Sequence, residues 1–201
     1  MNPEDAGIIG LLQQTAGWTT AAGQETETIL SSRVRLARNL QRYNFPGRCR
    51  EAERREILEF SKDQALKVNY LKGASFFSLD GITKLGRKAL EERRAVSSGL
   101  AEQEQSGVLI SPEQNVSLMI NEEDHLRLQT IFSGLDLLEA FRIADQVDDQ
   151  LQERMEVAFT ADHGFLTACP SNIGTGLRAS VLMHLPALVM GEKMDGLIED
   201  L

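Results

Sequence analysis

The sequence predicts an α+β fold in which helices flank an antiparallel sheet. Two short apolar runs, GVLIS and VSLMI, are separated by a Pro-Glu-Gln-Asn turn, which is typical of an antiparallel hairpin. The remaining strand and helix candidates do not alternate as the βαβ units of a parallel sheet do. A chain of 201 residues with 42% hydrophobic and 25% charged content is long enough for one globular domain with a sizeable core.

Residues 1–27 predict a short N-terminal helix followed by a polar linker, and residues 28–201 predict the main domain. The run at residues 29–36, ILSSRVRL, reads as a strand with Arg33 and Arg35 on one face. Further strands are expected at ASFFSLD and in the pair EVAFTA and GFLTAC. Helices are expected at residues 51–68, 82–95, 122–131 and 135–155, and from about Thr175 onward.

Composition excludes several classes of function. A formal net charge of -9 argues against a general nucleic-acid binder, because phosphate neutralisation needs a basic surface. Cys49 and Cys169 form no CxxC or Cys/His cluster, and no histidine has ligand spacing, so we expect no protein-built metal site and no disulfide framework. The N-terminus lacks the pattern of a signal peptide, and no apolar run is long enough to span a bilayer. These features predict a soluble cytoplasmic protein.

The segment NEEDHLRLQ, residues 121–129, places three carboxylates in a row. As a helix start, Asn121 would be the N-cap and Asp124 a capping-box acid, and acids in a first turn favour the helix dipole. Glu123 and Arg127 would then form an ordinary i, i+4 ion pair. Alternatively, the carboxylates bind a cationic group.

The segment CPSNIGTGLRAS, residues 169–180, suggests an anion site. If a helix begins at Thr175, its free amides point outward, and Arg178 falls in the first turn, where a cation opposes the helix dipole. Either a phosphate lies beside Arg178, or a neighbouring carboxylate pairs with it.

Three segments, SSRVRLARN, NEEDHLRLQ and CPSNIGTGLRAS, in this order and spacing, resemble the successive signatures of the phosphagen (guanidino) kinase family. TGLRASVLMHLPAL resembles most closely the bacterial protein arginine kinase branch, the McsB type. The likeness runs from about Thr28 to about Val189. It implies the glutamine synthetase-like fold of the guanidino kinase catalytic domain, of which residues 28–201 would form the front portion, incomplete at the C-terminus.

The resemblance implies that the γ-phosphoryl group of ATP passes to a guanidinium nitrogen, with Mg as cofactor. Glu123 matches the family's catalytic carboxylate, Asp124 is a second contact to the guanidinium, and Cys169 matches the reactive cysteine. A guanidinium is a poor nucleophile that must be oriented and relieved of a proton, which suits a carboxylate.

The phosphate-binding arginines of the family are matched by Arg33, Arg35, Arg127 and Arg178. Mg is held in such sites largely by phosphate and water, so the resemblance implies no metal ligand from the protein. At the nucleotide-proximal position where the family commonly has histidine, Arg94 stands here.

The resemblance further implies protein substrates that bear arginine, marked by phosphorylation for ATP-dependent proteolysis, in protein quality control and the stress response. It implies a zinc-binding activator protein and a Clp-type protease chaperone as partners, and a homo-oligomer. Because the resemblance implies that the family's catalytic domain continues well past the equivalent of Leu201 with a further phosphate-binding arginine, we expect the 201-residue chain alone to be feebly active or inactive and prone to self-associate.

Two alternatives stay open. A small-molecule guanidino kinase would run the same reaction on a free guanidino compound. A non-catalytic pseudokinase or regulatory module would keep the fold and bind a partner kinase or arginine-bearing proteins.

Overall fold

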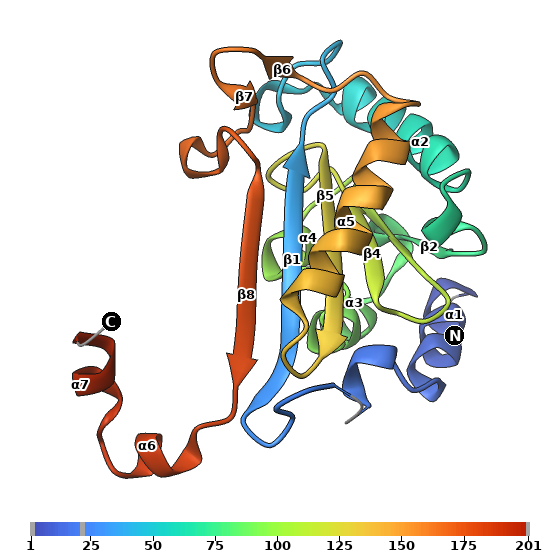
Figure 1. Ribbon diagram of the computed structural model, residues 1–201. Helices are drawn as coiled ribbons and strands as arrows, with labels where there is room; N and C mark the ends of the chain where they lie inside the picture. The colour runs from blue at the N-terminus through green and yellow to red at the C-terminus, as the bar shows by residue number, and fades with distance from the viewer. Residues whose placement is uncertain (1–2, 21–22, 200–201) are drawn as a thin grey trace.

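The fold is built on a six-stranded sheet in the order β2-β3-β4-β5-β1-β8, in which every neighbouring pair is antiparallel (Figure 1). The computed structural model describes residues 3–20 and 23–199. A separate two-stranded sheet pairs β6 with β7. The predicted α+β class with an antiparallel sheet is therefore confirmed.

The strands and helices lie close to where the sequence places most of them. The strands are β1 (Ile29–Arg38), β2 (Ser75–Ser78), β3 (Gly107–Ile110), β4 (Val116–Ile120), β5 (Leu126–Ser133), β6 (Phe159–Thr160), β7 (Gly164–Phe165) and β8 (Leu177–Met183). The α-helices are α1 (Pro3–Gln13), α2 (Glu51–Ala65), α3 (Lys84–Glu92), α4 (Ser98–Ala101), α5 (Leu137–Gln152), α6 (Pro186–Met190) and α7 (Met194–Glu199). Part of the linker expected before β1 falls at residues 21–22, outside the described residues.

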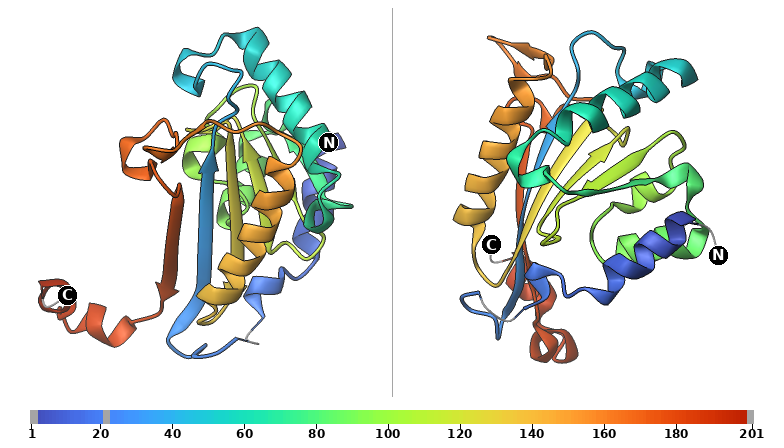
Figure 2. Two further views of the ribbon diagram at one scale, coloured as in Figure 1. Left: turned by 45° about the horizontal axis from the view of Figure 1, so that its top comes forward. Right: turned by 90° about the vertical axis from the view of Figure 1, so that its right-hand side faces the viewer.

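The helices divide between the two faces of the sheet (Figure 2). Helices α2 and α5 cover one face, where Ile57 and Val147 pack with Val34, Leu36 and Leu128 of the central strands. Helices α1, α3 and α4 cover the opposite face, but only over β2, β3 and β4. Among the described residues no α-helix covers β5, β1 and β8 on that opposite face, although the short 3-10 helix Gly17–Thr19 contacts β5 and β1.

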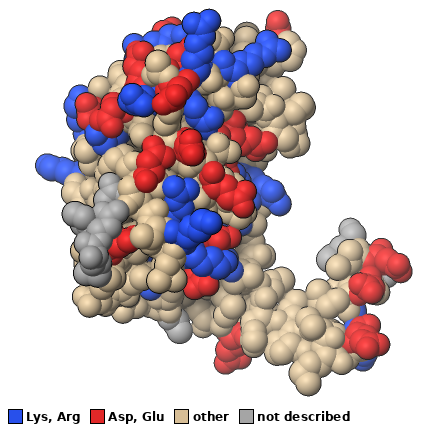
Figure 3. All heavy atoms as spheres, turned by 180° about the vertical axis from the view of Figure 1, so that it is seen from behind, with Lys and Arg blue, Asp and Glu red and all other residues tan. Residues whose placement is uncertain are grey.

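Strand alternation assigns the polar side chains to this uncovered part of the sheet. Because Val34 and Leu36 face α5, Arg33 and Arg35 point to the other side. Strand β8 is the sheet edge, and beyond it a chain segment with α6 and α7 stands clear of the body (Figure 3). None of the described helices combines the length and apolar character that crossing a membrane requires.

Two helices predicted from the sequence are wrong. Residues 121–125 form a turn and residues 126–133 form β5, so Asn121 caps no helix. Asn121 has a φ of 61°, the left-handed conformation that asparagine tolerates in turns. Leu126 and Leu128 face the core while Arg127 faces away, which is the period of a strand.

The helix expected from Thr175 is also replaced by a strand. Residues 177–183 form β8, whose backbone pairs with β1 from Leu177 to Met183. Gly176, just before it, has a φ of 61°, and a Cβ there would lie 2.6 Å from both the Ala37 oxygen and Arg38 Nη1. The helix-dipole argument for Arg178 therefore does not apply, because Arg178 lies in a strand, opposite Arg35 of β1.

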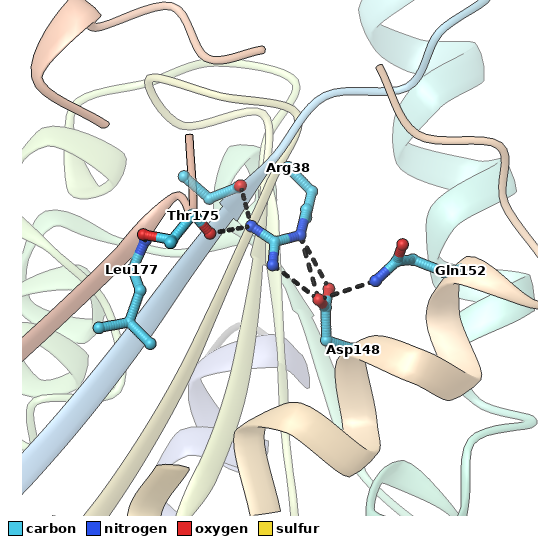
Figure 4. A network of polar contacts seen from close by, with 6 residues as sticks. Arg38, Asp148, Gln152, Thr175 and Leu177 are labelled. Carbon is cyan, nitrogen blue, oxygen red and sulfur yellow. Dashed lines mark hydrogen bonds and ion pairs between the residues drawn. The ribbon is translucent and has the colours of Figure 1, made fainter. Parts of the chain in front are cut away.

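A buried ion pair joins the sheet to α5 and to the loop before β8 (Figure 4). Arg38 donates from Nη2 to Asp148 at 2.7 Å and from Nε to both carboxylate oxygens at 3.1 Å. Its Nη1 donates to the Thr175 carbonyl at 3.0 Å, and its guanidinium lies 3.5 Å from the ring centre of Phe165. Gln152 adds a hydrogen bond to Asp148 at 2.9 Å. One guanidinium thus fixes three separate chain segments.

We expect Asp148→Asn to lower the free energy of unfolding by about 3 to 5 kcal/mol, because it leaves the buried Arg38 cation uncompensated. Chemical denaturation followed by circular dichroism measures the change. The matched control is Glu139→Gln on the same helix, which breaks an exposed pair with Arg142 and should leave the unfolding midpoint unchanged. Equal effects of the two changes would contradict a special role for the buried pair.

Candidate active site

The turn at residues 121–125 is held by four of its five side chains. Asn121 donates from Nδ2 to the carbonyls of Arg54 and Gln105, each at 2.7 Å. Its backbone N–H donates to the His125 carbonyl at 2.9 Å, which closes the turn. Glu123 is the one exposed residue of the five. The local structure therefore presents a single carboxylate to solvent.

Asp124 and His125 anchor the far side of the turn. Asp124 is 2% exposed, and its Oδ1 accepts hydrogen bonds from Asn39 Nδ2 and from the Ala168 N–H, both at 2.6 Å. Burial raises the pKa of Asp124, and the hydrogen bonds that it accepts oppose this rise. Asp124 thereby connects the end of β1, the turn, and the segment that leads to Cys169.

His125 is fully buried and neutral. Its Nδ1 accepts from the Leu40 N–H at 3.0 Å, so Nε2 carries the proton and donates to the Asn44 carbonyl at 2.9 Å. Burial lowers its pKa to about 4. His125 therefore serves local structure.

Glu122 is 7% exposed and accepts three hydrogen bonds. Its Oε1 accepts from Arg127 Nη1 at 2.5 Å and from the Ser97 hydroxyl at 2.6 Å. Its Oε2 accepts from the Glu123 N–H at 2.8 Å. Burial alone would raise the pKa of this carboxyl, but the hydrogen bonds, chiefly from Arg127 and Ser97, hold it below its ordinary value. The expected pair between Glu123 and Arg127 is replaced by one between Glu122 and Arg127.

Four arginines share the uncovered face of β5, β1 and β8. In the sheet register Arg35 lies opposite Arg178, and Ala37 lies opposite Arg127. Residues directly opposite in antiparallel strands project to the same side, so Arg33, two residues from Arg35, joins this face. The sheet therefore gathers Arg33, Arg35, Arg127 and Arg178, which the sequence singled out separately.

Among the described residues, Arg127 is the only one of the four arginines with an ion-pair partner, the Glu122 carboxylate. The Nε atoms of Arg33 and Arg35 are buried and have no hydrogen-bond partner among the described residues. Burial, and then the neighbouring positive charges, lower the pKa of Arg33 and lower that of Arg35 to about 10. A bound anion would satisfy both the charge and the free donors.

A cavity of about 160 Å³ lies where these elements meet. Its lining includes the candidate residues Arg35, Glu123, Arg127, Cys169 and Arg178. Cys169 Sγ lies 3.0 Å from the Ser171 hydroxyl. The structure thus brings a carboxylate, a thiol and three guanidinium groups to one cavity, with Arg33 further along the same face. Asp124 does not line it.

The segment that carries Arg94 is tied to the same face. Gln129 Nε2 donates to the Arg94 carbonyl at 2.7 Å, and Ser97, three residues later, donates to Glu122. Arg94 has a φ of 60° and lies 5.7 Å from the ring centre of Trp18. Its positive charge contributes to the lowered pKa of Arg33.

Sequence reasoning missed Glu122 and Ser97 as members of the site. It treated Glu122 as a helix-start acid and did not consider Ser97. A local signal did exist for Glu122. The alternation of apolar and polar residues in LRLQTIFS predicts a strand from Leu126, which leaves the acids in a turn just before the strand that carries Arg127. No cluster of three His, Cys, Asp or Glu side chains that could hold a metal occurs within the described part of the chain.

Comparison with known proteins relates this geometry to one family. Residues 56–201 match the family model "ATP:guanido phosphotransferase, C-terminal catalytic domain". The chain is 41% identical over 186 residues to a protein-arginine kinase of Bacillus subtilis, covering 91% of this chain and 51% of that protein. It is 42% identical over 188 residues to a protein-arginine kinase of Symbiobacterium thermophilum, covering 92% and 53%. The chain spans about half the length of the curated relatives it matches.

Solved structures share the fold. The substrate-free duplicated taurocyamine kinase from Schistosoma mansoni superimposes with a TM-score of 0.73 at 23% identity, over 92% of this chain and 30% of that one. Lombricine kinase gives 0.71 at 23% identity, over 96% and 61%. The predicted likeness to the guanidino kinase catalytic fold is therefore confirmed.

We expect stability to fall as the pH drops from about 6.5 to about 4, because unfolded His125 binds a proton in this range and folded His125 does not. A shift of this size corresponds to about 3 kcal/mol once the pH is below both pKa values. Denaturation midpoints measured from pH 7.5 to 4 test this. In His125→Asn the loss over this window should largely disappear, and an unchanged slope in that variant would contradict the assignment.

We expect Arg178→Ala without ligand to unfold at the parent's temperature or slightly above it, because Arg178 adds positive charge beside Arg35. The direction matches the helix-dipole argument, but the cause is repulsion within the sheet. Inorganic pyrophosphate should raise the unfolding temperature of the parent more than that of the variant. Arg55→Ala, a change at an exposed site on α2, should keep the full pyrophosphate effect. Strong destabilisation of ligand-free Arg178→Ala would instead indicate a structural partner for Arg178.

Proposed function

The chain belongs to the ATP:guanido phosphotransferase family, and from this premise we propose that it takes part in ATP-dependent phosphorylation of arginine side chains in proteins. The choice of protein arginine as substrate follows the two bacterial relatives, which are named protein-arginine kinase and are about 40% identical to this chain. Because the chain spans about half of their length, the activity of the whole protein, its substrates and its partners are part of the proposal.

One observation carries the proposal most strongly. In a single cavity, the exposed Glu123 lies with Cys169 and three arginines, while the neighbouring acids of its turn are buried and hydrogen-bonded to other groups. A free carboxylate suits a guanidinium substrate, and free guanidinium donors suit a phosphoryl group. The cavity thus holds both a carboxylate that can bind the guanidinium acceptor and arginines that can bind the phosphoryl donor.

We assign the proton-accepting role to Glu123. A guanidinium is a weak nucleophile because its lone pair is delocalised, and it holds its proton tightly. Paired hydrogen bonds to the Glu123 carboxylate would orient the attacking nitrogen and take up the proton as the bond to phosphorus forms. The Cys169 thiol would contact the same guanidinium. A direct contact between Asp124 and the substrate guanidinium stays a prediction. Asp124 Oδ1 already accepts hydrogen bonds from Asn39 and Ala168.

We assign phosphate binding to Arg33, Arg35, Arg127 and Arg178. Stabilising the charge of the transferring group is the main requirement of phosphoryl transfer, and fixed cations in a partly buried site meet it. The unpartnered Nε atoms of Arg33 and Arg35 support this assignment. Magnesium would reach the site with the nucleotide, held by phosphate and water, and would neutralise part of the phosphate charge.

The finer setting of the reaction rests on the family resemblance alone. We propose that residues 28–201 form the front portion of the catalytic domain and that residues 1–27 form a short helical segment and linker before it. We further propose a cytoplasmic role in protein quality control and the stress response, in which phosphoarginine marks substrates for a Clp-type protease chaperone, with a zinc-binding activator protein and self-association of the kinase.

The direct test is to incubate the chain with ATP, magnesium and an unfolded protein, followed by mass spectrometry for acid-labile phosphate on arginine. A parallel reaction with free arginine separates protein arginine kinase from small-molecule guanidino kinase. Mg-ATP binding without any phosphoarginine would favour the regulatory module, and phosphorylation of free arginine alone would overturn the protein substrate.

We expect Glu123→Gln to lower the rate of phosphoarginine formation by about a hundredfold or more, because the amide keeps the shape but cannot accept the proton. The thermal unfolding temperature should stay within a few degrees of the parent, since Glu123 is exposed. The control is Glu113→Gln, a change in the β3–β4 turn that lies outside the cavity lining. A rate for Glu123→Gln within about twofold of the parent, in a normally folded variant, would remove Glu123 from the mechanism.

A further inference from the structure

Glu122 holds together two groups to which the proposed reaction assigns separate tasks. Its Oε1 binds the guanidinium of Arg127, a proposed phosphate ligand, at 2.5 Å. Its Oε2 accepts from the backbone N–H of Glu123, the proposed base, at 2.8 Å. The carboxylate itself is 7% exposed and does not line the cavity. It therefore lies behind the reacting groups and contacts both.

A third contact extends this connection to another part of the chain. The Ser97 hydroxyl donates to Glu122 Oε1 at 2.6 Å and, as the N-cap of α4, accepts from the Leu100 N–H at 3.0 Å. Ser97 thus has its hydroxyl fixed from both sides. It follows Arg94 by three residues, and the Arg94 carbonyl is bound by Gln129 of β5. The segment from Arg94 to Ser97 is consequently attached to the site face at both ends.

We propose that Glu122 is a positioning residue that sets the base Glu123 and the phosphate ligand Arg127 in one fixed relation, and that Ser97 holds Glu122 in place to do so. This inference rests on the proposed function, since it gives Glu122 a part in the same reaction. It adds two residues that do not touch the reacting atoms. The chemical requirement is that base and phosphate ligand stay in register, because small misplacements in a transfer site cost large factors in rate.

The carboxylate form is required because three donors converge on it. Arg127, Ser97 and the Glu123 N–H all donate to it, and neither the guanidinium nor the N–H can accept. The Ser97 hydroxyl already accepts from the Leu100 N–H. A glutamine at position 122 has one acceptor oxygen and one NH₂ group. Whichever way the amide turns, its NH₂ faces a donor, so one of the two sides of the connection is lost. Glu122→Gln is therefore a near-isosteric change that breaks the coupling.

The experiment compares Glu122→Gln, Ser97→Ala and Ser97→Thr with the parent. Thr83→Ala is the matched control, because Thr83 caps α3 in the same way that Ser97 caps α4 but has no contact with the turn. The first readout is hydrogen exchange of the Glu123 backbone amide by NMR, which does not depend on activity. The second is kcat and KM for phosphoarginine formation.

We expect amide exchange at Glu123 to speed up roughly tenfold or more in Glu122→Gln and by a smaller factor in Ser97→Ala. The value of kcat should fall about a hundredfold in Glu122→Gln and about tenfold in Ser97→Ala, with a smaller change in KM for ATP. Ser97→Thr, which keeps the hydroxyl, should restore both readouts, and Thr83→Ala should leave both unchanged.

Two results separate the two claims. A parent chain that neither binds Mg-ATP nor forms phosphoarginine overturns the proposed function, and hydrogen exchange at Glu123 still tests the positioning inference in a chain without activity. A parent that forms it while Glu122→Gln matches its kcat, or keeps the Glu123 amide protected, overturns the positioning inference alone. A loss in Ser97→Ala that Thr83→Ala reproduces also overturns it, since the effect would then come from losing a helix cap.

Discussion

The structure around the site depends on one constraint, which is that a five-residue polar turn must be buried between two central strands. Buried polar groups are costly unless they are hydrogen-bonded. Asn121, Glu122, Asp124 and His125 meet this requirement by binding different parts of the chain, namely α2, the segment before α4, the end of β1 and the segment before Cys169. Only Glu123 is left free. The isolation of one carboxylate is therefore a consequence of how the other four side chains are satisfied.

The same constraint explains why cations can be crowded on the neighbouring strands. The turn anchors β5 against β4, and β5 sets the register of β1, which in turn pairs with β8. Helices α2 and α5 stabilise the opposite face of these strands with an apolar core. The sheet can therefore tolerate repulsion among its arginines, which adds to burial in lowering the pKa values of Arg33 and Arg35. Stability is supplied on one side of the sheet and charge is concentrated on the other.

The sequence predicted the sheet class, β1, the β3–β4 hairpin and the long helices because their periodicity is local and clear. It failed at LRLQTIFS and LRASVLM, where a helical ion-pair spacing and a helix-start pattern competed with strand alternation. The motifs specify residue types rather than elements, so the candidate residues could be named although two helices were wrong. Five of them line one cavity, whereas Arg33 and Asp124 do not, and their roles stay predictions. The partners of Glu122 and Asp124 could not be predicted, because Ser97 and Asn39 lie 25 and 85 positions away and only the folded sheet brings them near.

Gly176 gives the cavity a geometric reference point. With no side chain, it lies against the β1 backbone, where its carbonyl accepts from the Ala37 N–H at 2.9 Å. The distance between the two chains at this place is thus a backbone-to-backbone distance, which side-chain repacking can change very little. Arg178 follows two residues later, opposite Arg35, so the same backbone contact fixes the distance between the strands that carry the two arginines. The separation between Arg35 and Arg178 is thus set by a backbone contact. Side chains elsewhere in the core can vary while the space that these two arginines leave for an anion stays constant.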